Sequence, residues 1–252
     1  MRATSKMWCM YGDRPEPVEA ARSFVSKHLP SALSAFLGGS VMTAHRTPTS
    51  DLDVVVLLDG PPAPYRETFE HERWVVEAFV HTRASLEDFW ERDRERRVCS
   101  LLRMCAESIV LTDPAGAATD IQQRAAALLA GGPGPLTEPE VDAWRYRLTD
   151  LLDDMAGCDD EAELAFIAGA VLREVASIAL ATSGRWGGNG KALARQLAAH
   201  EPELVERLLN GHRHVVVYGD TAVLHRAAVE VLLRIGGPLL AGYRAEPTPR
   251  VR

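Results

Sequence analysis

Two aspartates one residue apart, Asp51 and Asp53, begin an apolar run that continues to Leu58. A β-branched run bounded by turn residues predicts a buried strand over residues 51–58. Successive side chains of a strand point to opposite faces, so both carboxylates are expected on one face and Leu52 on the other. Carboxylates this close repel each other, and a cation between them is the expected compensation. Oxygen ligands favour Mg²⁺ or Mn²⁺ over zinc.

A glycine-rich turn, Gly38-Gly39-Ser40, precedes the aspartates by ten residues. Its backbone N–H groups are unshielded by side chains and Ser40 adds a hydroxyl, so the turn suits phosphate oxygens. The alternative for Ser40 is a turn hydroxyl that bonds its own backbone. Ser50, next to the first aspartate, is a further nucleotide-binding candidate. Metal-binding carboxylates beside a phosphate-binding turn indicate phosphoryl or nucleotidyl transfer.

A third carboxylate, Glu77, stands in an apolar segment between Val76 and Ala78. A lone carboxylate in such company costs several kcal/mol unless it is paired or bound to metal. The alternative is an edge-strand residue whose side chain reaches water. If its strand lies beside that of the aspartates, three carboxylates converge and can hold two metal ions.

The stretches 36–40, 47–53 and 76–82 together resemble the nucleotidyltransferase superfamily that includes DNA polymerase beta. Within it they are similar to small bacterial two-domain nucleotidyltransferases, of which kanamycin nucleotidyltransferase is a known member. The resemblance is carried by the glycine-serine turn, the Asp-x-Asp pair and an acidic residue on a later strand. It covers roughly residues 36–82 in sequence and the helical half in architecture only.

The resemblance implies roles for five of these residues. Gly39 and Ser40 match the phosphate-binding turn, and Asp51 and Asp53 match the metal ligands. Glu77 matches the third carboxylate, as a metal ligand or as the general base for an acceptor hydroxyl. The implied reaction is Mg²⁺-dependent transfer of a nucleotide, AMP from ATP by expectation, with release of pyrophosphate. Two Mg²⁺ ions, a small-molecule acceptor such as an aminoglycoside and a homodimer belong to the same expectation.

The charge composition favours some classes of binding partner over others. The 252 residues carry 28 Lys plus Arg against 35 Asp plus Glu, a net charge of −7. A protein that coats long nucleic acid usually has a basic surface, so the acidic composition disfavours that role. Binding of a nucleotide or of a cationic small molecule is compatible with it. No zinc or redox motif links the four cysteines, Cys9, Cys99, Cys105 and Cys158. Neither a signal peptide nor a membrane span is predicted, which favours a cytoplasmic protein.

The pattern of elements changes at the Gly/Pro segment 131–135, the expected linker. An α+β fold is predicted: a mixed β-sheet flanked by helices over residues 1–133, then an all-α helical bundle over residues 134–252. The site is expected in the cleft between the two domains, because small-ligand sites favour interfaces.

The periodicity predicts individual elements on both sides of the linker. Before it, helices are expected at 17–28, 85–97, 101–107 and 115–130, strands at 51–58 and 108–111, and a hairpin over 65–82. After it, helices are expected at 138–155, 161–182, 191–209 and 220–235. Ser85 is the expected N-cap of the second helix, and Thr137 with Glu140 forms an expected capping box.

Two charged groups of the helical half are further candidates. The glycine-rich loop 183–191 offers Arg185 and Lys191 to a triphosphate, although a helix–helix loop with glycine caps is the alternative. Asp150 and Asp154 share a helix face with Asp153 and form a candidate wall for a cationic acceptor. The alternative is a solvated face, because charge runs are usually exposed.

Two other functions remain open. One is nucleotidyl modification of a protein or RNA hydroxyl, as in toxin–antitoxin systems that pair a nucleotidyltransferase with a helical domain. The other is a regulatory module that keeps the fold and binds nucleotide without turnover. The complete acidic set, Asp51, Asp53 and Glu77, favours an enzyme.

Overall fold

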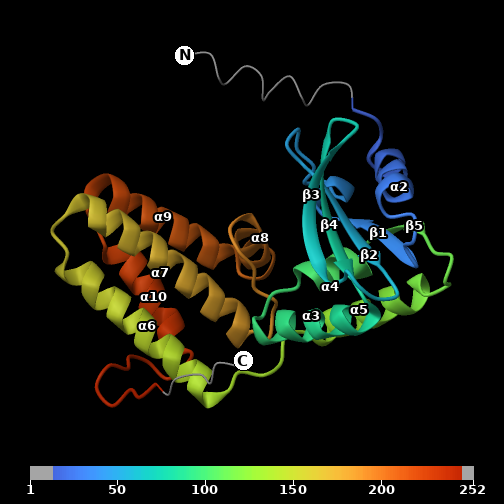
Figure 1. The fold of residues 1–252 in the computed structure, drawn as a ribbon. Coiled ribbons are helices and arrows are strands. Elements are labelled where there is room, and N and C mark those ends of the chain that lie inside the picture. Colours follow the sequence, from blue (N-terminus) through green and yellow to red (C-terminus); the bar gives the residue numbers. More distant parts are fainter. Residues whose placement is uncertain (1–13, 246–252) are drawn as a thin grey trace. The chain divides into compact units, whose positions relative to one another are not determined.

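A mixed sheet of five strands organises the first half of the chain in the computed structural model, which describes residues 14–245 (Figure 1). The strands are β1 (Ser34–Gly38), β2 (Leu52–Leu57), β3 (Tyr65–His71), β4 (Trp74–His81) and β5 (Ile109–Thr112). Their order is β3-β4-β2-β1-β5, with β2 and β4 parallel and the other neighbours antiparallel. The α+β class expected from the sequence is confirmed.

Helices cover both faces of this sheet. They are α2 (Pro17–His28), α3 (Arg83–Glu95) and α4 (Ser100–Ala106), while α5 (Ala118–Gly131) packs against α4. Helix α2 packs Phe24 and Val25 against one face, which alternation along the strands makes apolar through residues such as Val54 and Val76. The opposite face carries Asp53 and Glu77. The alternation of the strands thus separates the main core from the acidic face.

Helix α4 lies close to the acidic face. A Cβ added at Gly38, the last residue of β1, would meet the Cα of Met104 in α4 at 2.9 Å. The two backbones can approach this closely only because Gly38 has no side chain. Strand β1 was not expected from the sequence. All five of its residues are buried, so it has no alternation that would mark it as a strand.

The hairpin β3–β4 confirms the prediction for residues 65–82. Its two-residue loop consists of Glu72 and Arg73, both with positive φ (48° and 65°), as in a type I′ turn. The turn fixes the register, in which Arg66 lies opposite Phe79. Directly opposed side chains of an antiparallel pair share a face, so Arg66 lies on the face of the acids.

The expected N-cap of α3 is wrong by one turn. Thr82 is the N-cap, and its side chain accepts from the Ser85 backbone N–H while the Ser85 hydroxyl accepts from the Thr82 N–H. Ser85 is therefore the N3 partner of a reciprocal capping box. Helix α6 begins with the capping box of Thr137 and Glu140, as predicted.

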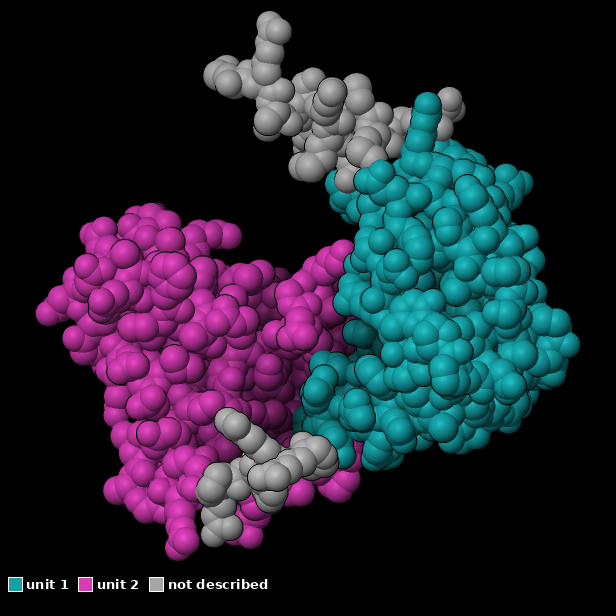
Figure 2. All heavy atoms as spheres, viewed as in Figure 1, with its two compact units in different colours: residues 1–132 teal, residues 133–252 magenta. Residues whose placement is uncertain are grey.

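The chain divides into two compact units, residues 1–132 and 133–252 (Figure 2). Within residues 133–245, the described part of the second unit, the regular elements are all helices: α6 (Glu138–Gly157), α7 (Glu161–Thr182), α8 (Lys191–His200), α9 (Pro202–Tyr218) and α10 (Ala222–Leu233). Their apolar faces share one core, which includes Leu148, Val171, Leu208 and Val231.

The single helix expected over residues 191–209 is wrong. It divides into α8 and α9 at Glu201, whose φ and ψ of −134° and 65° are not helical. The cause is Pro202, which has no N–H to continue a helix and disfavours helical geometry in the residue before it. Proline suits the first position of a new helix, so α9 begins there.

Helix α7 corrects the expectation that no apolar run is long enough to span a membrane. It has 22 residues and contains an 18-residue stretch with a mean hydropathy of 1.8, which suffices by length and composition. About half of that apolar stretch is buried inside the protein, with Val171, Val175 and Ile178 fully enclosed. Core helices of globular proteins have the same properties, and α7 packs as the core helix of its unit.

Candidate active site

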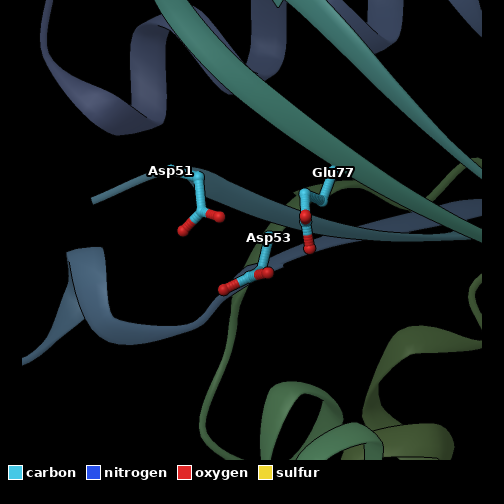
Figure 3. A group of neighbouring side chains, drawn as sticks. All are labelled: Asp51, Asp53 and Glu77. Atoms are coloured by element: carbon cyan, nitrogen blue, oxygen red, sulfur yellow. The ribbon is translucent and has the colours of Figure 1, made fainter. Parts of the chain in front are cut away.

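Three carboxylates converge on the acidic face of the sheet (Figure 3). Asp53 lies in β2, Glu77 in β4, and Asp51 immediately precedes β2. One oxygen from each side chain lies within 4.8 Å of the others, and all three residues are half-buried. Here β2 and β4 are parallel neighbours, and Asp53 is the register partner of Glu77. The structure therefore brings together the three carboxylates that were predicted to bind metal, although Asp51 lies just outside the strand.

This arrangement is costly without a counter-charge. At 4.8 Å and an effective dielectric constant of about 20, two carboxylates repel each other by roughly 3 kcal/mol. Strand pairing holds these groups together in spite of that repulsion. A cation bound among the three carboxylates could offset this repulsion.

The donor set fits a hard divalent ion. Two oxygens bound to one Mg²⁺ at ~2.1 Å are at most ~4.2 Å apart, so small side-chain rotations would bring these oxygens into range. The ligands are all carboxylate oxygens, with no sulfur or imidazole among the three, which favours Mg²⁺ or Mn²⁺. The triad can therefore hold one such ion, or two ions ~3.5–4 Å apart with bridging carboxylates.

Gly39 makes the position of Asp53 possible. Its φ is 79°, a conformation that side chains with a Cβ rarely adopt. A Cβ at this residue would lie 1.9 Å from Oδ2 of Asp53, well inside van der Waals contact. Gly39, which the sequence assigned to phosphate binding, is thus also the residue against which the Asp53 carboxylate packs.

The loop from Ser40 to Ser50 is held closed by its own hydroxyls. Ser40 begins a short 3₁₀ turn, η2 (Ser40–Met42), and its Oγ lies 3.2 Å from the Oγ of Ser50. The buried Ser50 hydroxyl also accepts a hydrogen bond from the Thr47 N–H at 2.9 Å. The two predicted nucleotide-binding serines are therefore adjacent in space. In this structure Ser50 joins the two ends of the loop that leads to Asp51.

A cation that the sequence did not single out completes the site. Nη2 of Arg66, on β3, lies 2.5 Å from Oε2 of Glu77, and its guanidinium carbon is 4.9 Å from the ring centroid of Phe79. The Arg66 side chain is 58% exposed and that of Glu77 22% exposed, so the pair contributes at most ~1 kcal/mol. The ion pair matters chiefly because it places a positive group at the rim of the acidic cluster.

The candidates in the helical unit do not form a cluster of this kind. Asp150 and Asp154 are exposed on α6. Arg185 is exposed in the loop after α7, and exposed Lys191 is the first residue of α8. All four residues belong to the unit 133–252.

Comparison with known proteins gives no family assignment. No protein-family model and no curated protein matches the chain. Among solved structures, a nucleotidyltransferase-like protein from Exiguobacterium sibiricum is similar, with 11% sequence identity and a TM-score of 0.45 over 86% of this chain and 72% of that one. These values are too low to carry conclusions about activity, which rest on the residues of this chain.

Proposed function

We propose that the protein is a Mg²⁺-dependent nucleotidyltransferase that moves a nucleoside monophosphate, AMP from ATP by preference, to a hydroxyl group of a small-molecule acceptor. The observation that carries the proposal is the convergence of Asp51, Asp53 and Glu77 beside the turn at Gly39 and Ser40. Metal-binding carboxylates next to a phosphate-binding turn are the parts that transfer at phosphorus requires.

The residues divide the work as follows. Asp51 and Asp53 bind the divalent ion, which neutralises charge on the phosphates when it is bound. Backbone N–H groups of the turn at Gly39 and the Ser40 hydroxyl hold a phosphate oxygen, because the first N–H groups of such a turn have no partner within it. Glu77 completes the metal site or accepts the acceptor proton.

The reaction balances without a further reactant. The acceptor oxygen attacks the α-phosphorus and forms a new P–O bond, while the bond from the α-phosphorus to its bridging oxygen breaks. Pyrophosphate leaves with that oxygen, and the acceptor proton passes to Glu77 or to water. Positioning and charge neutralisation supply most of the catalysis in such transfers.

A cationic acceptor such as an aminoglycoside is the specific proposal. Its support is the exposed carboxylate pair Asp150 and Asp154 on α6 and the overall charge of −7. Lys191 and Arg185 are proposed to bind phosphate groups. A cytoplasmic location and a homodimer remain part of the same proposal.

The test uses nucleotides labelled at the α-phosphate and a panel of small-molecule, RNA and protein acceptors. The native protein should transfer label, and the double variant Asp51→Asn with Asp53→Asn should lose at least ~10³-fold in rate, because metal charge stabilisation is worth several kcal/mol. Asp59→Asn, at an exposed aspartate after β2, is the matched control and should transfer normally.

Two results would overturn the proposal. Undiminished transfer by the double variant would mean that the triad is not the site. Nucleotide binding by the native protein without transfer to any acceptor would favour a regulatory module over an enzyme. Transfer to RNA or protein alone would replace the small-molecule acceptor.

A further inference from the structure

A cavity of about 320 Å³ opens between the β3–β4 hairpin and helices α3 and α4. The strands contribute Tyr65, Arg66, Phe79 and His81, while α3 and α4 contribute residues such as Phe89. Phe79, His81 and Arg66 belong to the same sheet face as the acids. The volume falls at the lower end of the range for small-ligand pockets.

The cavity is connected to the acidic cluster by one side chain. Arg66 lines the cavity and at the same time bonds Oε2 of Glu77 at 2.5 Å. Phe79 and His81 follow Glu77 by two and four residues along β4, so their Cα atoms lie roughly 7 Å and 13 Å farther along the strand. A ligand with one end at the triad therefore has the cavity within reach of its other end.

Aromatic side chains form much of the wall. Phe89 is 37% exposed although it lies in a concave surface, and its ring centroid is 4.9 Å from that of His81 in an edge-to-face arrangement. Phe79 lies across the cavity on β4. Exposed rings in a hollow favour a flat, apolar partner, because aromatic faces stack with a gain beyond area burial.

The polar groups of the cavity select against a polycation. Burial lowers the pKa of His81 to about 4, so the imidazole is neutral at pH 7, and its Nδ1 lies 3.4 Å from the Ser85 hydroxyl. Burial raises the pKa of the Asp93 carboxyl, whose Oδ2 already accepts the Leu101 N–H at 3.2 Å. The wall therefore sets one carboxyl group, Asp93, against the two cations Arg66 and Arg96.

We propose that this cavity binds the base of the nucleotide substrate, a neutral planar heteroaromatic ring attached to a phosphate group. The inference rests on the proposed function, and it adds a base subsite within the sheet unit. The phosphates then lie at the triad and the turn, with Arg66 at the boundary between phosphate and base. An aminoglycoside, which is polycationic and has no flat ring, does not match this wall.

The test compares two probes in the presence of Mg²⁺: the non-hydrolysable α,β-methylene analogue of ATP and inorganic tripolyphosphate. Two variants of the full chain change the cavity in opposite ways. Phe89→Ala removes an aromatic wall, and Ser100→Trp fills the cavity from an exposed position in the first turn of α4. Each should weaken binding of the ATP analogue up to about tenfold and leave tripolyphosphate unchanged, because one variant removes the stacking surface and the other blocks it.

Matched controls exclude a general effect on folding. Ile109→Ala removes an apolar side chain of the same 37% exposure from β5, at the opposite end of the sheet. Thr119→Trp adds a large ring at an exposed position in the first turn of α5. Both controls should bind the two probes like the native protein. The cavity variants should also flatten any preference among ATP, GTP, CTP and UTP, which a merely structural defect would not do.

The outcomes separate the base subsite from the proposed function. If the native protein binds tripolyphosphate with Mg²⁺ as tightly as the ATP analogue, or if neither cavity variant changes their ratio, the subsite is wrong while the nucleotidyltransferase proposal stands. An increase of the acceptor KM alone in the cavity variants would assign the cavity to the acceptor and overturn the subsite. If the Asp51→Asn, Asp53→Asn protein still binds tripolyphosphate in a Mg²⁺-dependent way, the proposed function fails instead.

Discussion

The two units of the chain treat acidic residues in opposite ways. In residues 1–132, Asp51, Asp53 and Glu77 are half-buried and forced within 4.8 Å of one another by the pairing of β2 with β4. In residues 133–252, Asp150 and Asp154 are exposed on α6, where water solvates them. Strand pairing thus holds the carboxylates of the triad close together, whereas Asp150 and Asp154 are exposed to solvent on a helix.

The half-buried triad is stronger evidence for a bound ligand than the exposed carboxylates on α6. Solvated charges on a helix face cost little, so their presence requires no ligand. Half-buried carboxylates within 4.8 Å of one another repel each other by several kcal/mol, a cost that a bound counter-charge would offset. Arg66 pairs with Glu77, one of the three carboxylates of the cluster.

Among single substitutions, the largest effect should follow from Gly39→Ala. The new Cβ would lie 1.9 Å from Oδ2 of Asp53, so the carboxylate must move away from the metal position. Displacing a catalytic group by about 1 Å costs ~10²-fold in rate, and we expect at least that loss of transfer, measured with α-labelled nucleotide.

The matched control lies in the helical unit. Gly219 also has positive φ, 68°, but a Cβ there would meet nothing within 4 Å. Gly219→Ala should cost only the ~1–2 kcal/mol of left-handed backbone strain and keep full transfer activity. Equal losses of transfer activity in the two variants would contradict the claim that Gly39→Ala acts by displacing Asp53.

A second effect concerns the acid stability of the sheet unit. Burial lowers the pKa of His81 to about 4, whereas an unfolded histidine takes up a proton near pH 6.5. As the pH falls from 6.5 to 4, the unfolded state gains that proton first, so the free energy of unfolding decreases by up to ~3 kcal/mol.

Denaturant titrations at pH 7 and pH 4.5 measure this effect. His81→Gln should remove part of the loss between the two pH values. The same change at exposed His225 on α10 controls for removal of an imidazole from the helical unit. A His81→Gln protein with the native pH slope would show that His81 takes up its proton equally in both states.

The smallest effect is expected in the helical unit. Asp150→Asn with Asp154→Asn should raise the KM of a cationic acceptor ~3- to 10-fold, because exposed ion pairs contribute at most ~1 kcal/mol each. The KM for ATP should not change. Steady-state kinetics with each substrate varied checks both values, and an unchanged acceptor KM would leave α6 as a solvated face.

Much of the sheet and its acids could be predicted from the sequence, because strand geometry is local. The β-branched run after Asp51 marks β2, and a period of two assigns Asp53 and Leu52 to opposite faces. The pairing of Asp53 with Glu77 requires only that β2 and β4 are neighbours. Pro202 could also have revealed the break between α8 and α9, since the signal lies in one residue.

The rest depends on contacts between distant segments. Strand β1 is buried on both faces and has no period to detect, and Gly38 is explained only by the approach of α4. Arg66 becomes part of the site because the turn at Glu72 and Arg73 sets the register of β3, a turn without the usual glycine signal. The cavity beside Arg66 is formed by two strands and two helices, so no local sequence pattern predicts it.

The most direct test of the central claim is divalent metal binding at the triad, which needs no knowledge of the acceptor. Free Mn²⁺ is measured by electron paramagnetic resonance during titration of the full chain with the α,β-methylene ATP analogue present. The account predicts binding by the native protein and by Asp150→Asn with Asp154→Asn, and an affinity at least ~10²-fold weaker in Asp51→Asn with Asp53→Asn. Native-like Mn²⁺ binding by that last variant would contradict the assignment of the triad as the metal site.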